Sequence, residues 1–119
     1  MNPFRDQETF MRACDQSVDG FDEAQYNMYK SLIDEEFNEL QEAHDMEAEL
    51  DALIDILVVT IGAIHSAGFD GEGAWKEVMS TNFAKIDKET GKVRKREDGK
   101  VLKPLGWKAP ELAQFLKKD

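Results

Sequence analysis

The sequence predicts an all-α fold, an antiparallel bundle of about four helices followed by a short C-terminal β-hairpin and loop segment. Two observations lead to this prediction. Apolar residues recur at helical spacing as far as residue 86, and the segments that show this period are joined by short connections. Helices joined by only a few residues are expected to lie antiparallel. The expected helices cover residues 4–16, 22–43, 46–67 and 73–86.

Each expected helix has its own local pattern. The first has four nonpolar residues at helical spacing: Phe4, Phe10, Met11 and Cys14. The second starts with Asp22 and Glu23, whose negative charges suit the positive end of a helix dipole. The third is apolar nearly all round between residues 53 and 64, so we expect neighbours to bury it as a central helix ending at Gly68. The fourth gathers five apolar residues on one side: Ala74, Trp75, Val78, Met79 and Phe83.

Beyond residue 86 the helical period stops. The stretch KVRKREDGKVL has the form of two extended arms around Asp98-Gly99, a dipeptide suited to a two-residue hairpin turn. Proline and glycine interrupt the next residues, and one or two helical turns are expected to start at Pro110. We expect a single domain over residues 1–119, with residues 87–119 forming a basic hairpin and C-terminal extension.

Charge is distributed unevenly along the chain. The net charge of −10 argues against a non-specific hold on nucleic acid, which depends on Lys and Arg neutralising phosphates. Between Lys85 and Lys103, however, there are eight basic residues and four acidic ones, against seven basic and 21 acidic residues in the rest of the chain. An acidic body that binds an anion is therefore expected to need metal ions as well as this basic segment.

Two further features bear on the location of the protein. Cys14 is the single cysteine and no signal-peptide pattern opens the sequence, so we expect a reducing, cytoplasmic setting. The longest apolar run, residues 52–64, carries Asp55 and is too short to span a bilayer. The sequence therefore predicts a soluble protein without a membrane partner.

The second expected helix places glutamates within its apolar stripe, in the stretch LIDEEFNEL. On a helical wheel Glu36 falls inside the apolar arc, Glu39 on its rim and Glu35 just outside it. An unpaired carboxylate buried among apolar side chains costs roughly several kcal/mol or becomes protonated. Glu36 is therefore expected to have a cationic partner.

The third expected helix carries Asp51 and Asp55 one turn apart on a shared face. If the connection lies at residues 44–45, a rise of about 1.5 Å per residue sets Glu39 level with Asp51, and Glu36 level with Asp55. Four facing carboxylates repel one another unless they are protonated or bind hard divalent cations, and oxygen ligands select Mg²⁺ or Mn²⁺. The alternative is that these glutamates form an ordinary solvated helix face, because EExxE by itself is a common surface pattern.

Four stretches, in this order, resemble the all-α nucleoside triphosphate pyrophosphohydrolases: EEFNEL, DALIDILVVTIGAIHSAGFD, AWKEVMSTNFAKID and GKVLKPLGWKAPEL. The resemblance is greatest to the MazG-like and phosphoribosyl-ATP pyrophosphohydrolase-like branch and covers residues 22–112. The family pattern is EExxE on one helix and ExxD on the next, together binding Mg²⁺. Glu35, Glu36 and Glu39 match the first half. The second half departs from the pattern, and Asp51 and Asp55, four residues apart, look like its substitute.

The resemblance also implies substrate contacts and an assembly. Asn82 and Lys85 match an Asn and a Lys that reach the triphosphate, and Lys100 and Lys103 look like further anion contacts. Members of the superfamily are usually dimers or tetramers, so a homodimer or homotetramer is expected to complete the bundle. By itself the basic run is equally well interpreted as a solvated hairpin. Trp107 is interpreted as a packing residue, with the alternative that it covers a ligand.

The function that follows from the resemblance is Mg²⁺-dependent hydrolysis of a nucleoside triphosphate, NTP or dNTP, to monophosphate and pyrophosphate, an activity of the house-cleaning type. Glu36, Glu39, Asp51 and Asp55 are expected to hold the metal. Glu35 is expected to orient or deprotonate the attacking water. Two alternatives stay open. One is a non-catalytic helical module that binds a partner protein, and the other is hydrolysis of a different phosphoanhydride such as phosphoribosyl-ATP.

Overall fold

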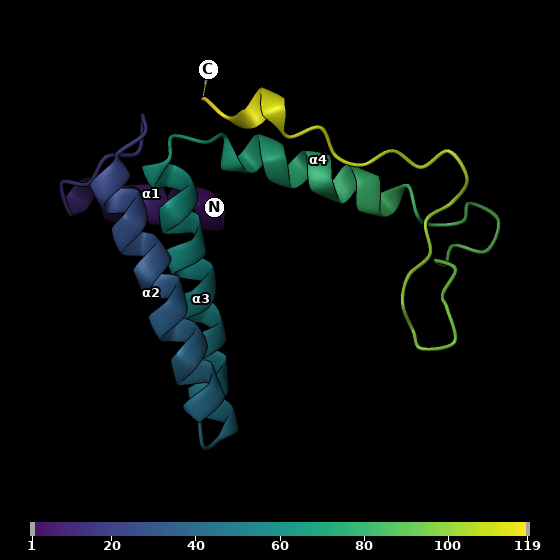
Figure 1. Ribbon diagram of the computed structural model, residues 1–119, viewed down its shortest axis with the longest axis horizontal. Coiled ribbons are helices and arrows are strands. Elements are labelled where there is room, and N and C mark those ends of the chain that lie inside the picture. The colour runs from purple at the N-terminus through teal and green to yellow at the C-terminus, as the bar shows by residue number, and fades with distance from the viewer. Residues whose placement is uncertain (1, 119) are drawn as a thin grey trace. The chain divides into compact units, whose positions relative to one another are not determined.

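The computed structural model describes residues 2–118, which form four α-helices and one 3₁₀ turn (Figure 1). The helices are α1 (Pro3–Ala13), α2 (Glu23–Glu42), α3 (Met46–Ser66) and α4 (Gly71–Phe83), and the 3₁₀ turn is η1 (Ala113–Phe115). The described residues contain no strand, so the prediction of an all-α fold is confirmed. The chain divides into two compact units, Met1–Gly71 with Phe115–Asp119, and Glu72–Gln114. Each unit is described by itself.

Side-chain caps fix the starts of the first three helices. The side-chain oxygens of Asn2, Asp22 and Asp45 accept hydrogen bonds from the backbone N–H groups three residues further on, at 2.9, 3.0 and 2.7 Å. These bonds satisfy N–H groups that lack a partner in the first helical turn. Asp22 is thus the N-cap of α2, at the position where the charge pattern predicts a helix start. Gly68 follows the end of α3 with a φ of 75°, a conformation that glycine adopts without strain.

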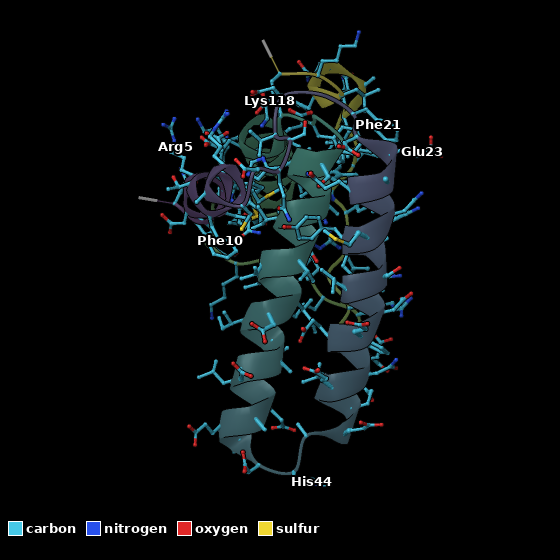
Figure 2. The ribbon with its side chains drawn as sticks, turned by 90° about the vertical axis from the view of Figure 1, so that its left-hand side faces the viewer. Arg5, Phe10, Phe21, Glu23, His44 and Lys118 are labelled. Atoms are coloured by element: carbon cyan, nitrogen blue, oxygen red, sulfur yellow. The ribbon has the colours of Figure 1, made fainter. Side chains whose placement is uncertain are left out.

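In the first unit, α2 and α3 form an antiparallel hairpin, and α1 packs against α3. Figures 1 and 2 show the two long helices side by side, and Figure 2 shows His44 at the tip of the connection between them. The core contains five buried side chains: Met11, Val18, Tyr29, Val59 and Ala63. Gly62 faces the Tyr29 ring so closely that a Cβ at this position would overlap the ring. The absence of a side chain at Gly62 therefore lets α2 and α3 approach each other.

The C-terminal segment belongs to this first unit. The Lys118 ammonium donates a hydrogen bond to the Val18 carbonyl at 2.6 Å and lies 3.3 Å from Nδ1 of His65. Figure 2 labels Lys118 at the end of the hairpin opposite His44. The Asp70 backbone N–H donates to the Phe115 carbonyl at 2.9 Å. The last residues are therefore tied to the end of α3 at which the core lies.

The prediction that neighbours bury α3 all round is wrong for the single chain. Leu53, Ile54 and Leu57 are 49%, 50% and 57% exposed, and Leu50 and Val58 are exposed as well. The reason is that α2 and α1 are the helices with extensive contacts to α3, and together they cover only part of its circumference. We call the set of Leu50, Leu53, Ile54, Leu57 and Val58 the apolar face of α3.

The second unit contains α4 and the segment after it. Where two strand-like arms are expected, the structure has two isolated antiparallel bridges, Ile86 with Val93 and Lys95 with Val101. The turn also differs from the predicted one. The Gly99 N–H donates to the Arg96 carbonyl at 2.9 Å, which centres the turn on residues 97–98 and leaves Gly99 outside its centre at a φ of 90°. The helix expected from Pro110 is reduced to η1, because a stretch of nine residues is too short to nucleate a stable helix by itself.

Among residues 2–118 no single helix is long and apolar enough to cross a membrane, although α3 and α4 taken as a pair meet the criterion on length and composition alone.

Candidate metal centre and phosphate-binding residues

Three carboxylates from two helices converge in the first unit. Glu36 and Glu39 lie one turn apart on α2, and Asp55 lies on α3. One oxygen from each of the three lies within 4.8 Å of the others. The antiparallel packing of α2 and α3 thus brings Glu36 and Asp55 together, in agreement with the register estimated from the length of the connection.

The surroundings of this group disfavour negative charge. The pKa of Glu36 is raised by burial above all, then by a hydrogen bond and charge from Glu39, and further by the charges of Asp55 and Asp51. The pKa of Asp55 is likewise raised by burial, and then by the charges of Asp51 and Glu39. Oε2 of Glu36 is buried and has no hydrogen-bond partner among the described residues. Each of these effects favours the protonated, neutral form or the approach of a cation.

The cationic partner expected for Glu36 is not a basic side chain of the described part of this chain. The ion pairs there join Arg12 to Glu8 and Asp19, Arg96 to Asp98, and Lys118 to Glu8. A hard divalent cation fits the site for two reasons. All three ligands are carboxylate oxygens, which Mg²⁺ and Mn²⁺ prefer, and a buried Glu36 oxygen lacks a partner that such an ion would supply.

Two acids predicted for this site lie outside the group of three. Asp51 is exposed on α3, one turn before Asp55, and acts on Glu36 and Asp55 through its charge. Glu35 is exposed on α2 next to Glu36 in the sequence. The structure therefore gathers Glu36, Glu39 and Asp55 directly and leaves Asp51 at the margin of the site.

Three of the four residues predicted to contact phosphates are linked to one another in the second unit. The Lys85 ammonium donates a hydrogen bond to Oδ1 of Asn82 at 3.1 Å. It also lies 5.0 Å from the centroid of the Trp107 ring, and the Lys103 ammonium lies 4.9 Å from the same centroid. Lys100 is separate from this group. It follows the turn at residues 96–99, and its backbone N–H donates to Asp98 at 3.1 Å.

The contact of Trp107 with two lysines is the feature that sequence reasoning missed. The sequence favours a packing residue, with ligand cover as the alternative, and the indole N–H does bond to the Thr81 carbonyl at 2.7 Å. Its ring, however, packs against two ammonium groups that come from separate segments of the chain. The signal available in the sequence was weak, namely a tryptophan four residues after a lysine in the basic segment.

A comparison with models of protein families matches residues 7–82 to phosphoribosyl-ATP pyrophosphohydrolase. No curated protein matches the chain. The matched region contains Asn82 and the five acids predicted for the metal site, Glu35, Glu36, Glu39, Asp51 and Asp55, and it ends before Lys85.

Proposed function

The chain belongs to the phosphoribosyl-ATP pyrophosphohydrolase family, within the all-α NTP pyrophosphohydrolase superfamily, and from this premise we propose that it is a Mg²⁺-dependent nucleoside triphosphate pyrophosphohydrolase. The family consists of metal-dependent hydrolases that act on phosphoanhydride bonds of nucleotide-type substrates. The proposed reaction converts an NTP or dNTP to the monophosphate and pyrophosphate. The observation that carries the proposal is the group of Glu36, Glu39 and Asp55, in which a buried carboxylate oxygen lacks a partner.

We assign Glu36, Glu39, Asp51 and Asp55 to the metal, with Mn²⁺ as a possible substitute for Mg²⁺. The exposed Asp51 joins the set because its charge already acts on both half-buried carboxylates. When bound, the metal neutralises phosphate oxygens and lowers the pKa of water. The helical hairpin contributes the fixed placement of the three converging carboxylates, which spares the site any rearrangement during the reaction.

Glu35 is our candidate for the general base. Its carboxylate is exposed and is not one of the three that converge, so it remains available to accept a proton. In the proposed step a water oxygen forms a bond to the α-phosphorus while its proton passes to Glu35. The bond from the α-phosphorus to the bridging oxygen breaks, and the electron pair leaves with pyrophosphate. Asn82, Lys85, Lys100 and Lys103 are assigned to the phosphate oxygens of the substrate.

We further propose that the active form is a homodimer or homotetramer located in the cytoplasm. The apolar face of α3 supports the assembly, because a row of half-exposed Leu, Ile and Val side chains along one helix is a typical contact surface between copies. A second chain packed on this face would complete a four-helix bundle around α3. The free thiol of the single cysteine, Cys14, suits a reducing compartment.

The second candidate substrate is phosphoribosyl-ATP, because the matching family is described by that activity. Its cleavage uses the same carboxylates and releases the same pyrophosphate, so only the group attached to the α-phosphate differs. The non-catalytic interaction module considered as an alternative receives no support from membership in a family of hydrolases.

The test is a product analysis with a panel of NTPs, dNTPs and phosphoribosyl-ATP in the presence of Mg²⁺ or of a chelator. In water labelled with ¹⁸O we expect a monophosphate that carries the label, together with unlabelled pyrophosphate, and only when Mg²⁺ is present. Release of a diphosphate and orthophosphate would overturn the proposed bond, and turnover in the chelator would overturn the metal requirement. Turnover of phosphoribosyl-ATP alone would replace the first substrate with the second.

A further inference from the structure

Trp107 occupies a fixed position in the second unit. The Trp107 backbone N–H donates to the Pro104 carbonyl at 3.0 Å and closes a turn in which Gly106 has a φ of 78°. The indole N–H donates to the Thr81 carbonyl at 2.7 Å, close to the C-terminal end of α4. The backbone bond thus closes the loop, the indole bond ties the loop to the helix, and together they hold the ring in place.

The fixed ring carries two ammonium groups, those of Lys85 and Lys103, which with Trp107 form the lysine–tryptophan cluster. In the part of the chain that the structure describes, neither lysine forms an ion pair with a carboxylate. An aromatic ring attracts a cation through its quadrupole but has no net charge. The ring therefore holds both ammonium groups without neutralising them, whereas a carboxylate in the same place would compete with an incoming phosphate.

Both lysines of the cluster also line a cavity of about 270 Å³ in the second unit. Its lining includes two more basic residues, Lys88 and Arg94, and a single acidic residue, Asp87. One oxygen of Asp87 accepts a backbone hydrogen bond from Glu89 at 2.8 Å, so this carboxylate is already engaged in the local turn. Four basic residues thus line the cavity against one acidic residue whose carboxylate is engaged, and the matching ligand is a compact, multiply charged anion.

We propose that Trp107 is a positioning residue that holds Lys85 and Lys103 ready for the diphosphate portion of the nucleotide, with Lys88 and Arg94 completing the anion pocket. This inference rests on the proposed function for the identity of the substrate. Lysine side chains are flexible, and a ligand normally has to immobilise them. The ring does so in advance, which lowers the entropic cost of binding the phosphate groups.

The binding test uses inorganic pyrophosphate in the presence of a chelator, so that a metal at the carboxylates plays no part. Trp75→Phe leaves Trp107 as the only tryptophan, and its fluorescence then reports on the cluster. We expect a saturable fluorescence change. The Kd for pyrophosphate obtained from it should rise about tenfold in Lys85→Met and in Lys103→Met, as for loss of one charge-assisted contact. Lys76→Met is the matched control, because Lys76 is an exposed lysine of the same unit outside the cavity lining, and it should bind as before.

The positioning role is tested by two substitutions of Trp107 in the complete enzyme. Both Trp107→Phe and Trp107→Leu lose the indole hydrogen bond to Thr81, but only Phe keeps an aromatic face. We expect Trp107→Leu to raise the KM for the nucleotide and the Kd for pyrophosphate, measured by calorimetry, about tenfold with little change in kcat. Trp107→Phe should recover most of this loss. Equal impairment of the two variants would mean that the hydrogen bond alone matters and would overturn the inference.

The outcomes separate this inference from the proposed function. If the enzyme produces monophosphate and pyrophosphate but pyrophosphate binding is insensitive to Lys85→Met and Lys103→Met, the lysine–tryptophan cluster is not a phosphate site and the inference fails alone. If pyrophosphate binds through the cluster but no nucleotide is cleaved, the anion pocket is supported and the proposed function fails.

Discussion

The three converging carboxylates of the first unit and the lysine–tryptophan cluster of the second each hold like charges close together, but they do so in opposite ways. Glu36, Glu39 and Asp55 are brought together by two packed helices, and burial and mutual repulsion raise the pKa of both Glu36 and Asp55. Lys85 and Lys103 are held by a neutral ring on a loop. The acidic site is therefore stable in its charged form only with a bound cation. The basic cluster, in contrast, keeps its charges without a bound anion.

The largest expected effect comes from removing one charge of the acidic site. Glu36→Gln or Asp55→Asn should lower kcat about a thousandfold, because several kcal/mol of stabilisation of the transition-state charge is lost with the metal. Steady-state kinetics measure this effect. Glu42→Gln removes an exposed acid from the same helix and should leave kcat unchanged. Comparable losses in Glu42→Gln and Glu36→Gln would show that total charge matters more than the convergent group.

Assembly gives the next effect. Leu57→Arg places a charge in the apolar face of α3, where the native side chain is 57% exposed in the single chain. If a second copy covers this face, burying an unpaired charge there should convert the oligomer to monomers, as measured by light scattering. Leu116→Arg is the control, since Leu116 is 56% exposed and lies outside α3. An unchanged mass for Leu57→Arg would remove α3 from the interface.

Metal binding should stabilise the fold through the acidic site alone. Mg²⁺ at about 100 times its Kd should raise the free energy of unfolding by about 2.7 kcal/mol, because the metal binds the folded form. Thermal unfolding with and without a chelator measures the shift. The shift should disappear in Glu36→Gln and persist in Lys85→Met. A shift that persists in Glu36→Gln would place the stabilising metal elsewhere.

The spacing of the helices that carry the acids depends on Gly62. Gly62→Ala introduces a methyl group that overlaps the Tyr29 ring and should lower the free energy of unfolding by about 1–3 kcal/mol through overpacking. Gly20→Ala is matched to it, because no atom lies within 4 Å of a Cβ at Gly20. Urea denaturation compares the two, and a tolerated Gly62→Ala would mean that Tyr29 can move aside at little cost.

The smallest effect is the pH dependence of the metal-free protein. The pKa values of Glu36 and Asp55 are raised in the folded state, so the folded protein holds their protons more tightly than the unfolded chain does. This contribution to stability is fully present below the ordinary carboxyl pKa of about 4, and it is lost as the pH rises through the raised values. In a chelator, Glu36→Gln should therefore be more stable than the wild type at neutral pH, with the difference vanishing in acid. The opposite sign would mean that Glu36 has a cationic partner when folded.

Sequence periodicity predicted the helices and the pairing of Glu36 with Asp55, because both follow from local geometry, but it paired Glu39 with Asp51, whereas Glu39 converges with Glu36 and Asp55 and Asp51 lies outside this group. Once α2 and α3 are helical and joined by three residues, Glu36 and Asp55 must lie at similar heights. The exposure of the apolar face of α3 was not predictable, since a pattern that is apolar all round does not say which chain covers it. The bond from Trp107 to Thr81 joins residues 26 positions apart through a loop, and such contacts leave no periodic signal.

The expected hairpin illustrates the same limit. Its arms are polar and highly charged, and an isolated pair of strands is marginally stable in water, so single bridges form at Ile86 and Lys95 in place of a ladder. Propensity located the reversal of the chain correctly but misplaced the centre of the turn by one residue, because Gly99 adopts its left-handed conformation after the turn.

The close approach of Gly62 and Tyr29 has a consequence for how the hairpin responds to its own charge. At one end the two helices are pressed together at this contact, and at the other a three-residue link ties them. The two helices are thus held at both ends, so the backbone segments that carry the acids cannot relax by splaying apart. The repulsion on the half-buried Glu36 and Asp55 is relieved when a proton or a cation is taken up, and the packing of the hairpin therefore favours ion capture.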